Sequence, residues 1–515
     1  MLTSTASTPP KFHPHDTDLS ASDLARLEER GLTPSEATRQ LELLRKGPRY
    51  ARLVRACRVD DGILRLSDRA KEEALERFAE AALNQRVSKF IPASGAATRM
   101  FKELAAWVLL EDAAEASPMP EAVRRFFDEF AQLALSETKQ GKLFENESRR
   151  LGRKEALRRF LLGEGALCSQ PKGLLPFHRA GNVVRTPFEE HCRETAELLG
   201  GRSEDIRLHF TVGAAHRESF ERQAAGALPA LQVEFGRRFG VTFSCQSPTT
   251  DTLALDDKGH AFRVGGELML RPGGHGSLLA NLEATEGDLV VVKNIDNIAK
   301  QPSAPSVLWQ RILVGELIRL ERLLASWREK LMKAPPREGI KEIAALLARL
   351  FGDSPRLTSQ DLPIEKRRRA LLHQIDRPLR VCGMVPVDAS TGGGPFWVRQ
   401  KNGDARRQIV ESVEIDPSEP EQRRLAAAGT HFNPVLMVCA LKSFEGIPHQ
   451  LSEFSDPEAS FITEKSLEGR PLLALERPGL WNGGMAEWNT LFIECDGAAF
   501  TPVKSVLDLL SPQHR

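Results

Sequence analysis

The sequence lacks the marks of a membrane, secreted or zinc-binding protein. Its seven cysteines occur singly, with no Cys-x-x-Cys pair and no zinc-finger spacing, and their number is odd. Scattered cysteines favour a reduced, cytoplasmic compartment. The first residues, MLTSTASTPPKFHPHD, have neither a basic start nor an apolar stretch, so we expect no signal peptide. No run approaches the ~20 apolar residues of a transmembrane helix, so we expect no membrane partner.

The chain also has little net charge. Lysine and arginine number 71 and aspartate and glutamate number 70, which leaves a net charge of +1. Such a molecule has no overall field that would steer it onto a nucleic acid, so a polyanionic ligand must be held by a local cluster of charge. What the chain does have is length: 515 residues with 41% hydrophobic content can bury a large core in more than one compact unit.

Apolar runs of strand length alternate with helical patterns, which predicts an α/β sheet with helices on its faces. Between residues 306 and 349 the apolar spacing predicts two strong helices. We find no internal repeat. The predicted strands cover residues 87–91, 206–212, 288–293, 379–385, 435–441 and 491–494.

A tight loop of small residues follows the first of these strands. Residues 92–97 read PASGAA, and residues 98–110 have a helical pattern. A loop of this kind presents free backbone N–H groups to an anion, Arg99 can add a full charge, and Thr98 can cap the helix. The loop is neither a Walker A motif nor a GxGxxG motif, and an ordinary strand–helix turn would give the same pattern.

The stretch PASGAATRM, residues 92–100, resembles the signature loop of the nucleotide-sugar pyrophosphorylases. The resemblance implies that the loop wraps the nucleotide phosphates and that Arg99 meets the triphosphate. Two glycines of the family are replaced here, by Ser94 and Ala97, which leaves less room for close approach of a phosphate. The implied nucleotide-binding residues of the loop are Ala93, Ser94, Gly95, Ala96, Ala97 and Thr98.

Two further segments resemble those of the uridylyltransferases, in the same order along the chain. KGLLPF at residues 172–177 implies that Lys172 faces phosphate, and FSCQSP at residues 243–248 implies that Gln246 reads the base. An amide both donates and accepts hydrogen bonds, which suits a uracil edge. A plain loop lysine and an unplaced surface glutamine remain the alternatives.

The motifs RPGGHGSL at residues 271–278 and VVVKNIDN at residues 290–297 resemble those of the UDP-sugar pyrophosphorylases. The first implies that Gly274 and His275 lie against the base. The second implies that Asp296, at the carboxyl end of a strand, helps to hold Mg²⁺, which prefers oxygen ligands. We expect Asp296 to serve the metal and to matter little for stability.

The most specific match is FTPVKSVLDLL at residues 500–510, which implies that Lys504 lies at the phosphates. With Arg99 and Lys172, it completes the predicted set of catalytic cations. The segment THFNP at residues 430–434 resembles the asparagine-bearing segment of the family, which implies that Asn433 contacts the sugar. Glu411 is the other expected sugar-binding residue.

The chain as a whole, including "RPGGHGSLL", "NIDN" and "PGLWNGGMAEWNT", resembles the bacterial domain-of-unknown-function 4301 family. Its likeness to the pyrophosphorylases covers residues 85–300 and 375–512 and implies a GT-A fold, with a mixed, mostly parallel sheet, helices on both faces and helical insertions. The expected parts are a disordered stretch at 1–18, an N-terminal helical cap at 19–85, a nucleotide-binding core at 86–300 with a helical insertion at about 115–165, a helical insertion at 301–375, and the sugar side of the core at 376–515.

The implied activity joins a nucleoside triphosphate, with UTP favoured, to a sugar 1-phosphate in the presence of Mg²⁺ and releases pyrophosphate. The expected partners are these two substrates, with no nucleic acid. Two alternatives remain open at this stage: a GT-A-like glycosyltransferase that uses a nucleotide sugar, and a nucleotide-binding protein without catalysis. The sugar and the oligomeric state remain undetermined.

Overall fold

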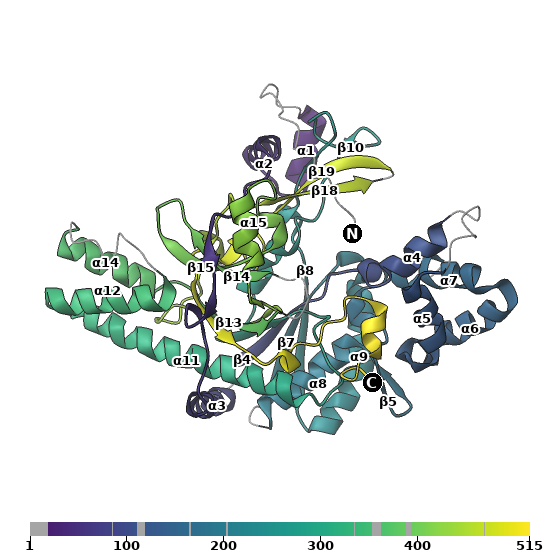
Figure 1. Cartoon of the computed structure of the whole chain (residues 1–515), viewed down its shortest axis with the longest axis horizontal. Coiled ribbons are helices and arrows are strands. Elements are labelled where there is room, and N and C mark those ends of the chain that lie inside the picture. The colour runs from purple at the N-terminus through teal and green to yellow at the C-terminus, as the bar shows by residue number, and fades with distance from the viewer. Residues whose placement is uncertain are drawn as a thin grey trace. The chain divides into compact units, whose positions relative to one another are not determined.

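The computed structural model is shown in Figure 1. The chain divides into two compact units. Unit 1 comprises residues 1–78, 246–290 and 312–495, and unit 2 comprises residues 79–245, 291–311 and 496–515. The predicted disordered stretch, residues 1–18, lies outside the described residues. The described residues are 19–84, 86–110, 119–163, 166–201, 204–333, 335–352, 362–387, 393–467 and 469–515.

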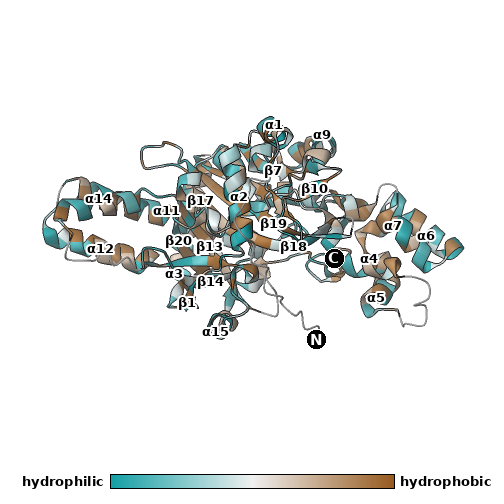
Figure 2. Ribbon diagram, turned by 90° about the horizontal axis from the view of Figure 1, so that it is seen from above, coloured by the Kyte–Doolittle hydropathy of each residue, from teal (hydrophilic) through white to brown (hydrophobic). Residues whose placement is uncertain are grey.

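A mostly parallel sheet, in the order β2-β3-β20-β13-β17, forms the centre of unit 1. The pairs β2–β3, β3–β20 and β20–β13 are parallel, and β17 runs antiparallel to β13. Helix α12 contacts β20 and packs on α14. Strands β20, β13 and β17 are almost continuously buried, which explains why their apolar residues stand together in the sequence. Figure 2 shows the apolar colour concentrated on β13 and β17.

Smaller sheets surround this centre within unit 1, namely β1-β14-β15 and β18-β19-β9. The helices of unit 1 are α1 (Ala21–Glu29), α2 (Pro34–Lys46), α10 (Leu279–Glu283), α12 (Arg337–Phe351), α14 (Ile364–Ile375) and α15 (Pro420–Ala427). Its strands are β1 (Leu53–Ala56), β2 (Arg58–Val59), β3 (Gly62–Leu64), β9 (Ala254–Leu255), β10 (Arg263–Val264), β11 (Glu267–Leu268), β13 (Leu379–Pro386), β14 (Gly394–Arg399), β15 (Ala405–Val410), β16 (His431–Phe432), β17 (Leu436–Ala440), β18 (Phe461–Leu467), β19 (Arg470–Glu476) and β20 (Asn489–Glu494).

Unit 2 is built on the strands β4, β7 and β8, which are parallel neighbours in that order. Helix α8 contacts β7 and α9, and α9 contacts β8. Three elements cross the boundary between the units: α3 (Asp68–Leu83), β12 (Leu289–Lys293) and α11 (Ala304–Met332). The elements of unit 2 are β4 (Val87–Pro92), α4 (Lys102–Leu109), α5 (Glu121–Glu129), α6 (Lys139–Leu151), α7 (Arg153–Leu162), β5 (His178–Ala180), β6 (Val183–Arg185), α8 (Pro187–Leu199), β7 (Asp205–Val212), α9 (Arg217–Phe235) and β8 (Arg238–Cys245).

Helices α4 to α7 share one aromatic core with the C-terminal segment of the chain. Phe126, Phe130, Phe144 and Phe160 stack or meet edge to face, with ring centroids 4.6–6.0 Å apart in the contacting pairs. Residues 506–510 form a 3-10 turn whose apolar side chains join this core. The core therefore fixes the chain immediately after Lys504.

The six predicted strands are confirmed, as are the two helices predicted between residues 306 and 349. The predicted N-terminal helical cap, however, is not helical throughout, because residues 53–64 form β1, β2 and β3. β1 pairs with β14, about 340 positions later, and local periodicity cannot reveal so distant a partner. The helix predicted for residues 98–110 is interrupted, since a 3-10 turn at Ala97–Arg99 precedes α4. Among the described helices, none has the length and hydropathy required to cross a bilayer.

Candidate functional site

The loop after β4 presents exposed backbone to the solvent in unit 2. Ser94, Gly95 and Ala96 are exposed, and within the described chain their N–H groups donate to no protein acceptor. Ala93 and Ala97 are fully buried, and backbone hydrogen bonds hold the two ends of the loop. A Cβ placed on Gly95 would meet nothing within 4 Å, so there is open space in front of the loop. Three neighbouring exposed N–H groups that have no acceptor in the described chain can receive an anion.

Lys172 lies directly beside this loop. Its backbone N–H donates to the Gly95 carbonyl at 3.2 Å. Its ammonium Nζ donates to the Asp296 carboxylate Oδ2 at 2.9 Å and to the Val503 carbonyl at 3.0 Å. The side chain is only 10% exposed, so the charge is held in one place. A fixed ammonium next to free N–H groups suits a bound phosphate.

The segment after β12 pairs with the C-terminal segment that carries Lys504. Asn297 and Pro502 form an antiparallel bridge, and the Val503 N–H donates to the Asp296 carbonyl at 2.9 Å. This pairing puts the Lys504 ammonium 4.0 Å from Asp296 Oδ2, with 61% of its side chain exposed. A buried lysine and an exposed lysine therefore flank one carboxylate, beside the loop after β4.

The remaining cation of the predicted set, Arg99, is exposed and has no ion pair in the described part of the chain. The next residue, Met100, accepts a hydrogen bond from the Val506 N–H at 3.0 Å, which ties this end of the loop to the C-terminal segment. The expectation that Thr98 caps a helix is wrong, because its hydroxyl donates to the Cys168 carbonyl at 3.0 Å. Thr98 thus stabilises the loop against a neighbouring segment.

Asp296 has an ion-pair partner in Lys172, so we expect it to contribute to stability as well as to a metal site. Its Oδ2 accepts from Lys172, whereas its Oδ1 makes no hydrogen bond in the described chain. The described residues contain no group of three or more His, Cys, Asp or Glu side chains that could hold a metal by themselves. One carboxylate oxygen fits Mg²⁺ only together with phosphate oxygens and water, which is how this ion is commonly bound.

Asp296→Asn is expected to lower the free energy of unfolding by about 2 kcal/mol, because it leaves the buried Lys172 ammonium without its counter-charge. Urea unfolding measures this effect. Asp205→Asn is the matched control, since Asp205 pairs with Arg238, whose side chain is 76% exposed, and its loss should cost less than about 1 kcal/mol. Equal costs for the two variants would contradict a structural role for Asp296.

A second group of predicted residues meets within unit 1, around His275. Its ring stacks on Trp481, with centroids 4.1 Å apart, and its Nδ1 accepts the Leu480 N–H at 3.1 Å. The Glu411 carboxylate lies 3.7 Å from His275 Nε2 and accepts the Trp481 indole N–H at 2.9 Å. Burial lowers the pKa of His275. Gly274 adopts a φ of +76°, which a side chain would strain. Trp481 was not predicted as a site residue, although its segment, PGLWNGGMAEWNT, is one of those that carry the family resemblance.

Gln246 and Asn433, also in unit 1, differ in whether their side-chain amides have hydrogen-bond partners. The Gln246 amide Nε2 is buried and has no hydrogen-bond partner in the described chain, which leaves it available to a ligand. Asn433 is 3% exposed, and its amide donates to the Gly383 carbonyl at 2.8 Å and accepts the Val435 N–H at 3.0 Å. These bonds give Asn433 a role in the fold, and its sugar contact stays a prediction.

Glu414, close to Glu411 in sequence, is buried and accepts hydrogen bonds from the Asn482 amide at 2.6 Å and from the Glu411 N–H at 2.8 Å. Burial raises the pKa of Glu414 to about 8. Between about pH 4.5 and 8 the folded protein therefore keeps a proton that the unfolded chain has released.

Because of this proton, the stability contributed by Glu414 is present at low pH and is lost as the pH rises through that window. We expect the wild type to lose on the order of 1 kcal/mol per pH unit relative to Glu414→Gln, which cannot titrate. Urea unfolding from pH 5 to pH 8 measures the difference. Exposed Glu419→Gln should follow the wild type, and a pH-independent difference between wild type and Glu414→Gln would contradict this assignment.

Sequence reasoning also missed a buried charge network in unit 2. Glu194 on α8 forms ion pairs with Lys89 of β4 and with Lys293 of β12, the latter at 2.6 Å, and all three side chains are completely buried. Burial lowers the pKa of Lys293. Burial alone would raise the pKa of Glu194, but the two ammonium groups hold it well below its usual range. His191 meets the Ile295 carbonyl at 3.2 Å, so α8 contacts the segment that carries Asp296.

Solved structures of UDP-sugar pyrophosphorylases are similar to this chain. The uridine diphosphate N-acetylglucosamine pyrophosphorylase from Trypanosoma brucei has a TM-score of 0.50 and 13% identity, with 95% of this chain and 79% of that chain covered. A mutant of UDP-glucose pyrophosphorylase from Leishmania major, in complex with UDP-glucose, has a TM-score of 0.45 and 12% identity, with 96% and 79% covered. At these identities the likeness concerns the fold alone.

The sequence profile described as "Domain of unknown function (DUF4301)" matches residues 20–515. No curated protein matches the sequence.

Proposed function

The chain belongs to the DUF4301 family, and from the site in unit 2 we propose that it is a nucleotidyltransferase that joins a nucleoside triphosphate to a sugar 1-phosphate. The observation that carries this proposal is the meeting of the loop at Gly95 with Lys172, Asp296 and Lys504. These residues span about 400 positions of sequence. A ligand that carries several phosphates suits this site. The site offers three N–H groups without an acceptor in the described chain, two lysines and one carboxylate oxygen, on a mostly parallel α/β fold. We assign this fold to the GT-A type.

The proposed reaction is a single displacement. A phosphate oxygen of the sugar 1-phosphate attacks the α-phosphorus, the bond from this phosphorus to the bridging oxygen breaks, and pyrophosphate leaves with both electrons of that bond. No covalent nucleophile from the protein is needed, so catalysis consists of positioning and charge stabilisation.

Each group in unit 2 has a distinct task in this reaction. The N–H groups of Ser94, Gly95 and Ala96 hold the triphosphate, and buried Lys172 offers a charge at a fixed point. The mobile ammonium of Lys504 can follow the negative charge that develops on the leaving pyrophosphate. Asp296 would help to hold Mg²⁺, which would supply positive charge to neutralise the phosphates.

Ala97 replaces a glycine of the pyrophosphorylase loop. This replacement would favour a protein that binds a nucleotide without catalysis only if the alanine side chain obstructed the phosphates. In the structure Ala97 is fully buried and points into the helical core, while Ser94 is exposed with a hydroxyl that can donate a hydrogen bond. Neither side chain therefore narrows the open space in front of Gly95. This geometry supports the catalytic proposal over the purely nucleotide-binding alternative.

We propose UTP as the preferred triphosphate, because Gln246 has an unsatisfied buried amide and an amide matches a uracil edge. Isothermal titration with UTP, CTP, ATP and GTP in the presence of Mg²⁺ tests this proposal. We expect UTP to bind at least tenfold more tightly than the purine nucleotides, and Gln246→Ala to reduce that preference. Equal affinities or a purine preference would contradict the assignment of Gln246.

A further inference from the structure

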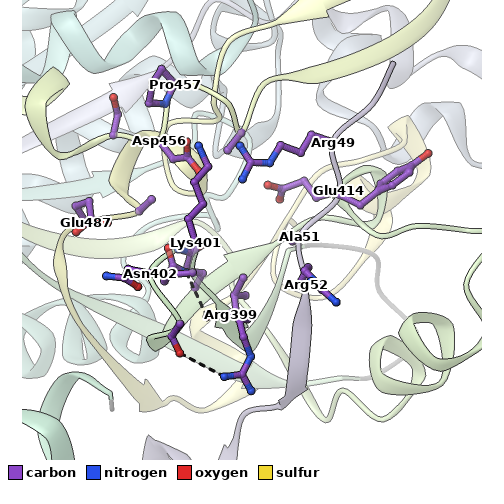
Figure 3. A pocket seen from close by; sticks show the side chains of 18 residues that line it. Arg49, Ala51, Arg52, Arg399, Lys401, Asn402, Glu414, Asp456, Pro457 and Glu487 are labelled. Atoms are coloured by element: carbon purple, nitrogen blue, oxygen red, sulfur yellow. Dashed lines mark hydrogen bonds between the residues drawn. The ribbon is translucent and has the colours of Figure 1, made fainter. Parts of the chain in front are cut away.

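Unit 1 contains a pocket that belongs to none of the predicted sites. Its volume is about 640 Å³, within the range of pockets that bind small molecules. We call it the β1–β14 pocket, because the segment leading into β1 and the turn after β14 form much of its wall (Figure 3). Its cationic side chains are Arg49, Arg52, Arg399 and Lys401.

The charges of these four side chains are only partly balanced. Arg49 and Lys401 share one carboxylate, Glu458, to which the Lys401 ammonium lies at 2.7 Å. Arg52 and Arg399 have no carboxylate partner within the described chain. The Arg399 guanidinium donates to the Gly403 carbonyl, at 3.3 Å.

The carboxylates in the pocket wall do not cancel this excess. Glu487 already pairs with Arg377 at 2.6 Å and with Arg406. Burial raises the pKa of Glu414 to about 8, so this group is largely uncharged at neutral pH. Among the described carboxylates of the wall, this leaves Asp456 as a negative charge, and its Oδ1 accepts the backbone N–H of Glu458 at 3.0 Å.

The strand register places the two arginines without a carboxylate partner in the described chain opposite each other. Leu53 of β1 is opposite Val398 of β14, and the Arg399 N–H donates to the Arg52 carbonyl at 2.9 Å. Arg52 and Arg399 are therefore opposite each other on neighbouring antiparallel strands, and Figure 3 shows both on one side of the pocket. Like charges in such positions destabilise a strand pair. An anion bound to both guanidinium groups would relieve this repulsion, so the arrangement favours an anion site.

We propose that the β1–β14 pocket binds a small organic phosphate through the guanidinium groups of Arg52 and Arg399. Two arginines match the charge of a phosphate dianion, and the planar donor fork of arginine fits phosphate oxygens. The pocket is larger than an inorganic phosphate ion needs. Ala51, Pro457 and Ala459 supply apolar wall for a carbon skeleton, while Asn402 adds a polar group. This site lies in unit 1 and is separate from the cluster around Lys172 in unit 2.

Thermal shift and isothermal titration with glucose 6-phosphate, ribose 5-phosphate and glycerol 3-phosphate test the proposal. Glucose, which lacks the phosphate, and inorganic phosphate, which lacks the carbon skeleton, are the control probes. We expect at least one phosphomonoester to bind more tightly than glucose and more tightly than inorganic phosphate. Its Kd should rise at least tenfold in the double variant Arg52→Gln/Arg399→Gln. It should be unchanged in Arg69→Gln, whose side chain is 87% exposed elsewhere in unit 1.

Lys504→Ala separates this pocket from the proposed active site, because it should weaken UTP binding or turnover and leave the phosphomonoester affinity as it is. The double variant should melt at the same or a higher temperature than the wild type without ligand, since it removes a like-charge pair. Binding that survives the double variant would overturn the proposal, as would failure of all three phosphomonoesters to bind at millimolar concentration.

Discussion

Lys504→Ala is expected to reduce turnover about a hundredfold while the protein stays folded. The Lys504 ammonium lies 4.0 Å from Asp296 and is 61% exposed, so its loss removes little packing. In the proposed reaction it stabilises charge on the departing pyrophosphate. Removing one such interaction typically costs on the order of 3 kcal/mol of transition-state stabilisation.

Steady-state kinetics with UTP and the preferred sugar 1-phosphate measure this effect. Lys142→Ala, on the exposed face of α6, is the matched control and should retain wild-type turnover. Lys504→Arg should recover part of the activity, because the charge returns in a bulkier form. Wild-type turnover in Lys504→Ala would remove this lysine from the mechanism.

Glu194→Gln is expected to be the most destabilising single substitution in unit 2. The change leaves the fully buried ammonium groups of Lys89 and Lys293 without a counter-charge. Breaking a buried ion pair in this way typically costs about 3–5 kcal/mol of the free energy of unfolding. The same substitution at Glu218, whose side chain is 83% exposed, should cost less than about 0.5 kcal/mol.

Urea unfolding followed by circular dichroism compares the two variants. The triple variant Lys89→Met/Glu194→Leu/Lys293→Met provides a second measurement, because it replaces every member of the network with an apolar side chain. It should be far more stable than Glu194→Gln, since no unpaired charge remains buried. A Glu194→Gln variant as stable as Glu218→Gln would contradict the assignment of a buried network.

Strands buried on both faces could be predicted from the sequence, whereas the short, partly exposed strands β1, β2 and β3 could not. β12 and β13 consist almost entirely of buried apolar residues, so each appears as a continuous apolar run. β14 pairs with β1, across a sequence separation of about 340 residues, and its exposed end carries Arg399. A strand whose register depends on so distant a partner has no local signature, which is why residues 19–85 were expected to be helical.

Lys172, Asp296 and Lys504 were selected by their resemblance to family motifs, and the structure supplies the contacts that bring them together. Nothing in the spacing of Lys172, Asp296 and Lys504 predicts their proximity, which depends on the pairing of Asn297 with Pro502. The ion pair of Asp296 was missed because a sequence does not reveal which carboxylate is paired.

Buried charges were the least predictable feature. Glu194 occupies a helix with several other acidic residues, and a charged residue in such a pattern is usually solvated. Its burial depends on Lys89 and Lys293, which come from two separate strands. Trp481 was missed for a related reason, because its role depends on His275 and Glu411, two residues distant in sequence.

Measuring pyrophosphate release from UTP tests the central claim most directly. The purified protein is incubated with UTP, Mg²⁺ and a panel of sugar 1-phosphates, and both products are quantified. We predict that one sugar 1-phosphate yields pyrophosphate and a UDP-sugar in equal amounts, and that Lys504→Ala reduces both together. UTP binding without pyrophosphate release across the whole panel, or transfer of sugar from a UDP-sugar to an acceptor without pyrophosphate exchange, would contradict the proposed nucleotidyltransferase.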